Sequence, residues 1–178
     1  MSDHELRELE RRYRESQSVE DEAAWLAARL RSGGIERERV ATAALCGHPA
    51  ALLAAGDLVS TLGPGPSLLE ALLQLEGRPA LVEVAQEVAE RDPAVSASPR
   101  RAQLAELFAA LRSFAEPQAF LEDVAQIKEE AVAQGDFELA GYLRVLELLV
   151  RPGAPLPLLD AMQALRLAWG ALVVRGHG

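Results

Sequence analysis

The chain has 178 residues, of which 49% are hydrophobic and 25% are charged, so it is long and apolar enough to bury an ordinary core and is not disordered. Alanine and leucine, with 32 and 30 residues, far outnumber valine, isoleucine and threonine, with 13, 2 and 2, and this excess of helix formers argues strongly against a sheet protein. The formal net charge of −9 argues against nonspecific binding to nucleic acid or to an anionic membrane surface, so we expect protein partners.

The distribution of apolar residues also bears on location. No stretch supplies the roughly eighteen consecutive apolar residues of a membrane span, and the first residues, MSDHELRELERR, are charged rather than signal-like. A single cysteine, Cys46, cannot form an internal disulfide, which fits a reducing compartment. We therefore expect a cytoplasmic protein.

The first third of the chain is predicted to be a string of short helices. Helical spacing of apolar residues predicts an amphipathic helix over about 3–15. Ser18 then has the features of an N-cap for a second helix, over about 19–31, because three acidic residues follow it and favour the positive end of the helix dipole. A third helix is expected over about 36–46, and Pro49 suits the first turn of a fourth, over 49–55.

Two predicted loops frame the central helices. The LGPGP run within 57–66 breaks any regular element, and a leucine-rich helix follows over about 68–75. Arg78-Pro79 begins the next helix, and Asp92-Pro93 ends it. The small, proline-ended stretch AVSASP, 94–99, is the second predicted loop, and a well-patterned helix then ends near Ala115.

The region 117–151 is predicted to be an αα-hairpin. Apolar residues of its first helix fall at spacings of four, three and four, and Gln134-Gly135-Asp136 supplies a helix stop followed by an N-cap. Because the turn is short, the two helices must run antiparallel with their apolar faces in contact. The residues that define these faces are Phe120, Val124, Ile127, Ala131, Phe137, Ala140, Leu143, Leu146 and Val150.

A last helix, over about 158–172, completes the predicted fold, with Leu159, Met162, Leu165, Trp169 and Leu172 inward. The sequence therefore predicts one all-α domain, 1–178, with about nine or ten mostly short antiparallel helices in a bundle or an irregular stack of hairpins. Its expected parts are 1–56, 66–115, 117–151 and 157–173.

The hairpin sequence IKEEAVAQGDFELAGYLRVLELL resembles the UVR motif, the helical hairpin of the excision-repair proteins UvrB and UvrC and of ClpC-type unfoldases. The resemblance extends over about 35 residues. Val145 stands where the motif usually has an aspartate. The resemblance to the UVR motif implies that the hairpin mediates protein–protein contacts, in which one hairpin pairs with another or docks on an adaptor. The residues that carry it are Ala131, Asp136, Phe137, Glu138, Ala140, Leu143 and Arg144.

The N-terminal segment has a resemblance of its own. LRELERRYRE, SVEDEAAWL and CGHPAA are similar to stretches in small uncharacterised helical proteins of myxobacteria. This similarity covers about the first 55 residues and implies a helical module without implying an activity.

The sequence has few of the side chains that usually carry out catalysis. The chain has three histidines and one cysteine and lacks the usual metal and phosphate motifs, so we predict no catalytic, metal or cofactor residue. Cys46 beside His48 is better explained as a small buried hydrophobe and a turn residue than as an activated thiol. The alternative is a small-molecule-binding protein or enzyme with a pocket near Trp25, Cys46, His48 or Trp169.

The main functional hypothesis is a non-enzymatic interaction module, an adaptor, regulator or assembly component that binds a protein through the hairpin. Asp136 caps the second helix, Phe137 is expected to staple the turn, and Glu138, Tyr142 and Arg144 are expected to form the exposed contact set. A homodimer through 117–151 is one expected form. The other alternative is an acidic inhibitor or immunity-type protein, since residues 116–138 hold seven acids against Lys128, a balance of −6.

Overall fold

The computed structural model describes residues 3–56, 68–113, 117–152 and 160–175, which form ten helices without a strand, so the predicted all-α fold is confirmed. Within these ranges no helix combines the length and the apolarity that a membrane crossing requires. In chain order the helices are α1 (Asp3–Ser16), α2 (Val19–Ser32), α3 (Arg37–Leu45), α4 (Pro49–Ala55), α6 (Leu68–Arg91), α7 (Pro93–Ala97), α8 (Arg101–Ser113), α9 (Pro117–Ala133), α10 (Phe137–Val150) and α11 (Asp160–Arg175).

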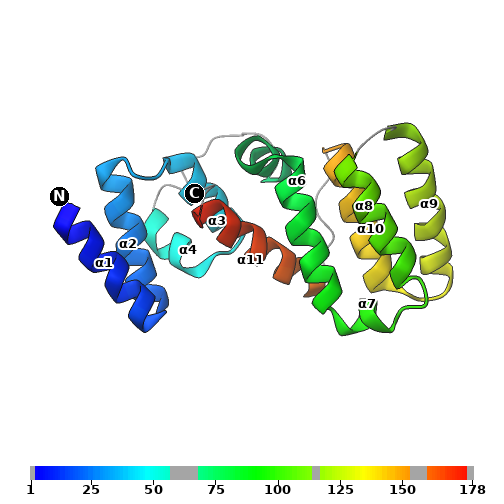
Figure 1. Ribbon diagram of the computed structural model, residues 1–178, viewed down its shortest axis with the longest axis horizontal. Coiled ribbons are helices and arrows are strands. Elements are labelled where there is room, and N and C mark those ends of the chain that lie inside the picture. Colours follow the sequence, from blue (N-terminus) through cyan, green and yellow to red (C-terminus); the bar gives the residue numbers. More distant parts are fainter. Residues whose placement is uncertain (1–2, 57–67, 114–116, 153–159, 176–178) are drawn as a thin grey trace.

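The helices are stacked along one long axis (Figure 1). The α1–α2 pair lies at one end and the α9–α10 hairpin at the other, and α11 returns to the middle, where it packs on both α3 and α6. The described apolar side chains that are buried form one continuous cluster from Ala23 to Val174. Of the two predicted arrangements, the irregular stack of hairpins describes the molecule better.

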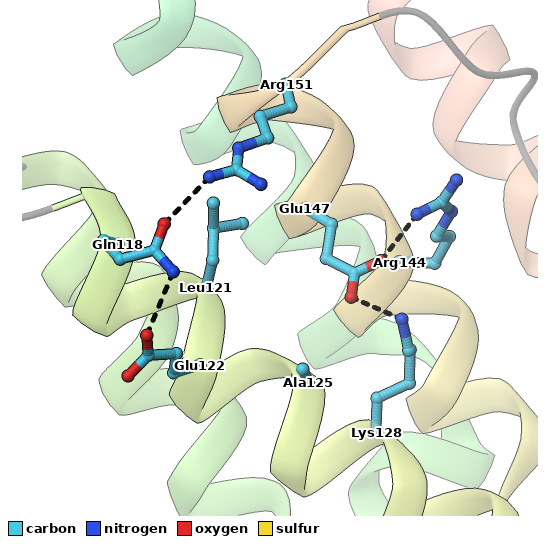
Figure 2. A pocket seen from close by; sticks show the side chains of 8 residues that line it. All are labelled: Gln118, Leu121, Glu122, Ala125, Lys128, Arg144, Glu147 and Arg151. Carbon is cyan, nitrogen blue, oxygen red and sulfur yellow. Dashed lines mark hydrogen bonds and ion pairs between the residues drawn. The ribbon is translucent and has the colours of Figure 1, made fainter.

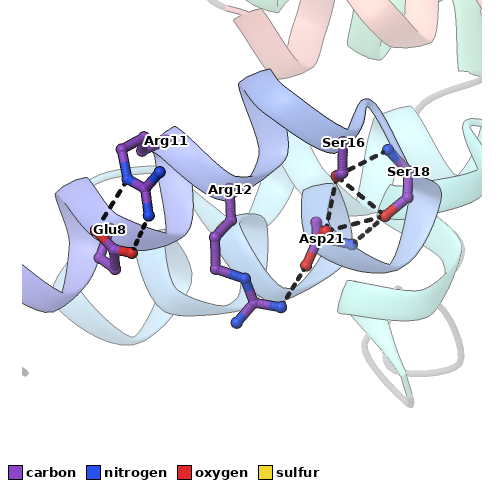
Figure 3. Close-up of polar contacts among 6 residues, drawn as sticks. All are labelled: Glu8, Arg11, Arg12, Ser16, Ser18 and Asp21. Atoms are coloured by element: carbon purple, nitrogen blue, oxygen red, sulfur yellow. Dashed lines mark hydrogen bonds and ion pairs between the residues drawn. The ribbon is translucent and has the colours of Figure 1, made fainter.

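Side-chain caps fix the turn between α1 and α2, as predicted. The Ser18 hydroxyl accepts the Asp21 N–H at 3.1 Å, and the Asp21 carboxylate in turn accepts from the Ser16 hydroxyl at 2.7 Å (Figure 3). Arg12 of α1 reaches the same carboxylate at 2.7 Å. At the other end of α2, Gly33 has a φ of 73°, the left-handed conformation that ends the helix. These contacts set α1 antiparallel on α2.

The structure corrects one predicted loop in the centre of the chain. The stretch 94–99 was expected to be irregular, but α7 occupies most of it because the Asp92 carboxylate accepts the Ala94 N–H at 2.9 Å and Pro93 takes the first helical position. The two helices expected on either side of residue 77 form α6 with a kink at Gly77, where φ is 76°. The predicted loop 57–66, the helix end near Ala115 and Leu159 lie outside the described residues.

Three separate elements meet at a half-buried arginine. Arg39 of α3 forms an ion pair with the Glu76 carboxylate of α6, whose side chain is fully buried. The same guanidinium donates to the Val173 carbonyl of α11 at 3.0 Å and to the Leu75 carbonyl at 3.4 Å. Beside this joint, Trp169 is fully buried and its indole N–H donates to the Leu81 carbonyl at 3.1 Å. The N-terminal helices are thereby connected to the rest through α11.

Candidate functional site

The α9–α10 hairpin turns where the sequence predicted it. Gly135 has a φ of 76°, and the Asp136 carboxylate caps α10 by accepting the Leu139 N–H at 3.2 Å. The Ser98 hydroxyl donates to the same carboxylate at 2.7 Å, which connects the turn to the segment after α7. The turn is therefore held both by its own cap and by a neighbouring element.

A groove of about 390 Å³ runs between α9 and α10 (Figure 2). In this groove the Glu147 carboxylate of α10 accepts from Lys128 of α9 and, at 2.7 Å, from Arg144 of its own helix. Burial raises the pKa of Glu147, but the hydrogen bonds from the two cations outweigh it and hold the pKa below its usual range. Glu147 is therefore ionised at neutral pH and connects the two helices.

A second polar chain closes the other end of the groove. The Gln118 side chain accepts from Arg151 at 3.0 Å and donates to Glu122 at 3.0 Å. With Lys128 and Arg144, the lining has three cations against the two carboxylates of Glu122 and Glu147, a local balance of +1 in a chain of net charge −9. All three cations of the hairpin line this groove, so positive charge exceeds negative charge among the lining residues.

Two exposed apolar side chains stand at the turn end of the hairpin. Phe137 is 57% exposed and Val132 is 49% exposed. Val132 lies four residues after Lys128 on α9, and Phe137 lies seven before Arg144 on α10, so helical geometry puts each on the side of its helix that lines the groove. We call this surface the hairpin face: Gln118, Leu121, Glu122, Ala125, Lys128, Val132, Phe137, Arg144, Glu147 and Arg151.

Two expectations about single side chains are wrong. Phe137 was expected to staple the turn, but more than half of its surface is in solvent. Tyr142 was expected to be exposed, but it is fully buried and its hydroxyl donates to the Asp92 carboxylate at 3.3 Å. The cause is the junction of α6 and α7 at Asp92, since both helices pack on α10. Glu138, one turn before Tyr142, is half-buried on the same side, and Arg144 is half-exposed on the hairpin face.

Sequence reasoning missed the partners of Arg144. Lys128 and Glu147 are 19 residues apart, and whether they meet depends on the register in which the two helices pack. Apolar spacing predicts which sides of the helices face each other, but a shift by one turn leaves that pattern nearly unchanged. The available signals were the i,i+3 spacing of Arg144 and Glu147 on one helix and the fact that Lys128 is the single lysine of the chain.

The residues of the predicted alternative pocket have separate partners. Trp25 stacks on Tyr13 of α1, with ring centroids 5.5 Å apart. Cys46 is buried, and burial raises the pKa of its thiol to about 12, so the thiol is protonated at neutral pH. His48 caps α4, since its Nδ1 accepts the Ala51 N–H at 3.3 Å, and a Cβ at position 170 would lie 3.0 Å from that of Cys46. This corner is tightly packed.

Among the described residues, no group of three or more histidine, cysteine, aspartate or glutamate side chains is placed to hold a metal ion. Comparison of the chain with protein-family models, with curated proteins and with solved structures finds no match.

Proposed function

We propose that the chain is a non-enzymatic protein-interaction module that binds a protein partner through the hairpin face. The observation that carries this proposal is Phe137, a large apolar side chain that is 57% exposed at the first position of α10. Covering a phenylalanine with a partner contributes up to about 1.5–3 kcal/mol, and aromatic anchors of this kind dominate protein interfaces. Val132 beside the turn enlarges the apolar area.

The order of the polar groups around this anchor supports the same proposal. Lys128 and Arg144 are held by Glu147, and Arg151 is held by Gln118, so these long side chains are already positioned by hydrogen bonds before a partner arrives (Figure 2). Binding to side chains that are already ordered costs less conformational entropy than binding to mobile ones. An apolar anchor next to a prearranged charged groove suits specific recognition of a protein surface.

The partner is either a second copy of the chain, as the UVR resemblance implies, or a different protein. Size-exclusion chromatography with light scattering over a concentration series distinguishes them. The hairpin variant is Phe137→Ala/Arg144→Glu, which removes the anchor and puts a glutamate beside Glu147. The matched control is Leu53→Ala/Arg31→Glu, which makes the same two kinds of change on the exposed surface of α4 and α2. Circular dichroism verifies that both variants are folded.

We expect a native dimer to become a monomer in the hairpin variant and to persist in the control. If the native chain is a monomer, the proposal requires that a protein captured from a lysate of the source organism by the native chain and by the control is lost with the hairpin variant. The proposal is wrong if neither assembly nor capture distinguishes the two variants. An interaction that weakens steeply with salt favours the acidic-inhibitor alternative, because docking on Phe137 is mainly apolar.

A further inference from the structure

A second groove, of about 640 Å³, lies on the opposite side of α10 from the hairpin face. Four helices line this open groove: the end of α6, the beginning of α7, the first turns of α10 and the middle of α11. Its volume is in the range of small-molecule sites, which in helical proteins commonly lie between helices. It does not involve Trp25, Cys46, His48 or Trp169.

Most of the groove is apolar because the side chains on its walls are short. Ala164 and Ala168 form the α11 wall, Pro93 and Ala94 form the α7 wall, and Val88 of α6 completes them. A leucine in place of either α11 alanine would narrow the groove at this wall. The groove can therefore receive the apolar body of a ligand without moving the helices.

The polar groups of the groove are mainly acidic. Asp92 accepts hydrogen bonds from the Tyr142 hydroxyl at 3.3 Å and from the Ala94 N–H at 2.9 Å, so its carboxylate is fixed in place. Glu138 forms no hydrogen bond or ion pair through its carboxylate with the described residues. The one cation in the lining, Arg91, is turned to Glu87, 3.6 Å away, and its side chain is 80% exposed.

Tyr142 does not change this charge balance. Burial raises the pKa of its phenol, and the Asp92 carboxylate adds to the effect, so the hydroxyl keeps its proton. Two carboxylates beside a neutral hydroxyl repel an anion and attract a cation. Apolar walls with one acidic end are the chemical complement of a molecule that has an apolar body and one positive group.

We propose that the groove between α6, α7, α10 and α11 binds a small amphipathic amine, with the amine at Glu138 and Asp92 and the apolar body along Ala164 and Ala168. This site is independent of the hairpin face and does not rest on the proposed function. The ion pair at Glu138 is partly exposed, so its contribution is modest and the apolar contacts supply the rest of the affinity.

The test uses three probes of equal chain length: hexylammonium, hexan-1-ol and hexanoate. Each is titrated into the ¹⁵N-labelled full chain, and amide chemical shifts are followed by NMR. We expect hexylammonium to cause saturable shifts at Ala94, Glu138 and Ala164, hexan-1-ol to bind more weakly at the same place, and hexanoate not to bind. No saturable shift at these amides, or equal binding of the ammonium and the alcohol, overturns the assignment of an amine.

Variants separate the two parts of the site. Glu138→Gln keeps the shape and removes the charge, so it should weaken hexylammonium binding by about 2- to 5-fold and leave hexan-1-ol unaffected. Ala164→Leu adds a larger side chain at an exposed position of α11, which preserves the fold, and should weaken the binding of both probes. Glu129→Gln, at an exposed position of α9, is the control for charge. Unchanged hexylammonium binding in both groove variants contradicts the proposal.

Discussion

The two ring nitrogens of His48 face two different residues, Ala51 and Glu22. Its Nδ1 accepts the Ala51 N–H and caps α4, and its Nε2 lies 3.7 Å from a Glu22 oxygen of α2. Burial lowers the pKa of His48, Glu22 opposes that shift, and Arg175 of α11 adds to it. A protonated Nδ1 has no lone pair for the Ala51 N–H, so the cap requires the neutral ring.

This arrangement predicts a loss of stability on acidification. Because the pKa of His48 is lowered in the folded state, the unfolded chain, with a histidine pKa near 6.5, binds the proton more readily. The contribution of the neutral His48 cap to the free energy of unfolding is complete above about pH 6.5 and is lost as the pH falls below that value. We expect urea unfolding between pH 7.5 and 5 to show a steeper decline for the native chain than for His48→Asn, which keeps a neutral cap. Parallel declines would contradict this.

At the scale of single residues, the sequence was informative where the interaction is local. Ser18 and Asp136 were predicted as N-caps, and both accept a backbone N–H three residues ahead. Tyr142 was mispredicted because its hydroxyl meets Asp92, the N-cap of α7, which is 50 residues away in the sequence. Local capping depends on a few adjacent residues, whereas burial depends on which elements arrive from elsewhere.

Among the elements, α11 shows how one small residue sets a packing distance. Gly170 lies where α11 crosses the corner between α3 and α4, and a Cβ there would be 3.0 Å from the Cβ of Cys46, 3.1 Å from that of His48 and 3.3 Å from the Ala43 carbonyl oxygen. These distances are shorter than normal van der Waals contact. The helices can approach this closely only because position 170 has no side chain.

We therefore expect Gly170→Ala to destabilise the protein. Overpacking costs about 1–3 kcal/mol, and the better helix propensity of alanine offsets about 1 kcal/mol, so a net loss of about 1 kcal/mol is expected in the free energy of unfolding. Gln163→Ala, at an exposed position of the same helix, is the control and should stay within about 0.5 kcal/mol of the native chain. An unchanged or raised stability of Gly170→Ala in urea unfolding would show that the corner between α3 and α4 shifts to accommodate the added methyl group.

The elements themselves were largely predictable, and their ends less so. Apolar spacing and caps predicted the hairpin, whose α9 and α10 lie within 117–151, and the proline at residue 49 marked the beginning of α4. The short α7 was missed because five residues are too few for periodicity, and only the Asp92-Pro93 cap signalled it. The resemblance to the UVR motif stays a prediction.

For the whole molecule, the joint at Arg39 is the most consequential contact. Arg39→Met removes the ion pair from a fully buried carboxylate and the hydrogen bond to the Val173 carbonyl at once. We expect a loss of about 1.5–3 kcal/mol in the free energy of unfolding, the usual range for losing hydrogen bonds that involve a charged group. Arg37→Met, two residues earlier and exposed, should change it by less than about 0.5 kcal/mol. A loss below about 1 kcal/mol for Arg39→Met would mean that apolar packing alone holds α3, α6 and α11 together.

The order of the helices in the stack could not be predicted from the sequence. Arg39 and Val173 are 134 residues apart, and nothing in the local pattern of either indicates the other. An all-α composition restricts the fold class, but many arrangements of ten amphipathic helices bury comparable apolar areas. Which helix pairs form depends on matching shapes such as Gly170 against Cys46, and these become visible only in three dimensions.

The position of α11 also has a consequence for synthesis. Ribosomes add about 5–20 residues per second, so Val173 follows Arg39 by roughly 7–27 s. Until α11 has been made, α3 and the kinked α6 lack the helix that packs on both of them. We conclude that the middle of the stack cannot reach its native packing until α11 has been made, whereas the hairpin at 117–151 can form as soon as its own residues are available.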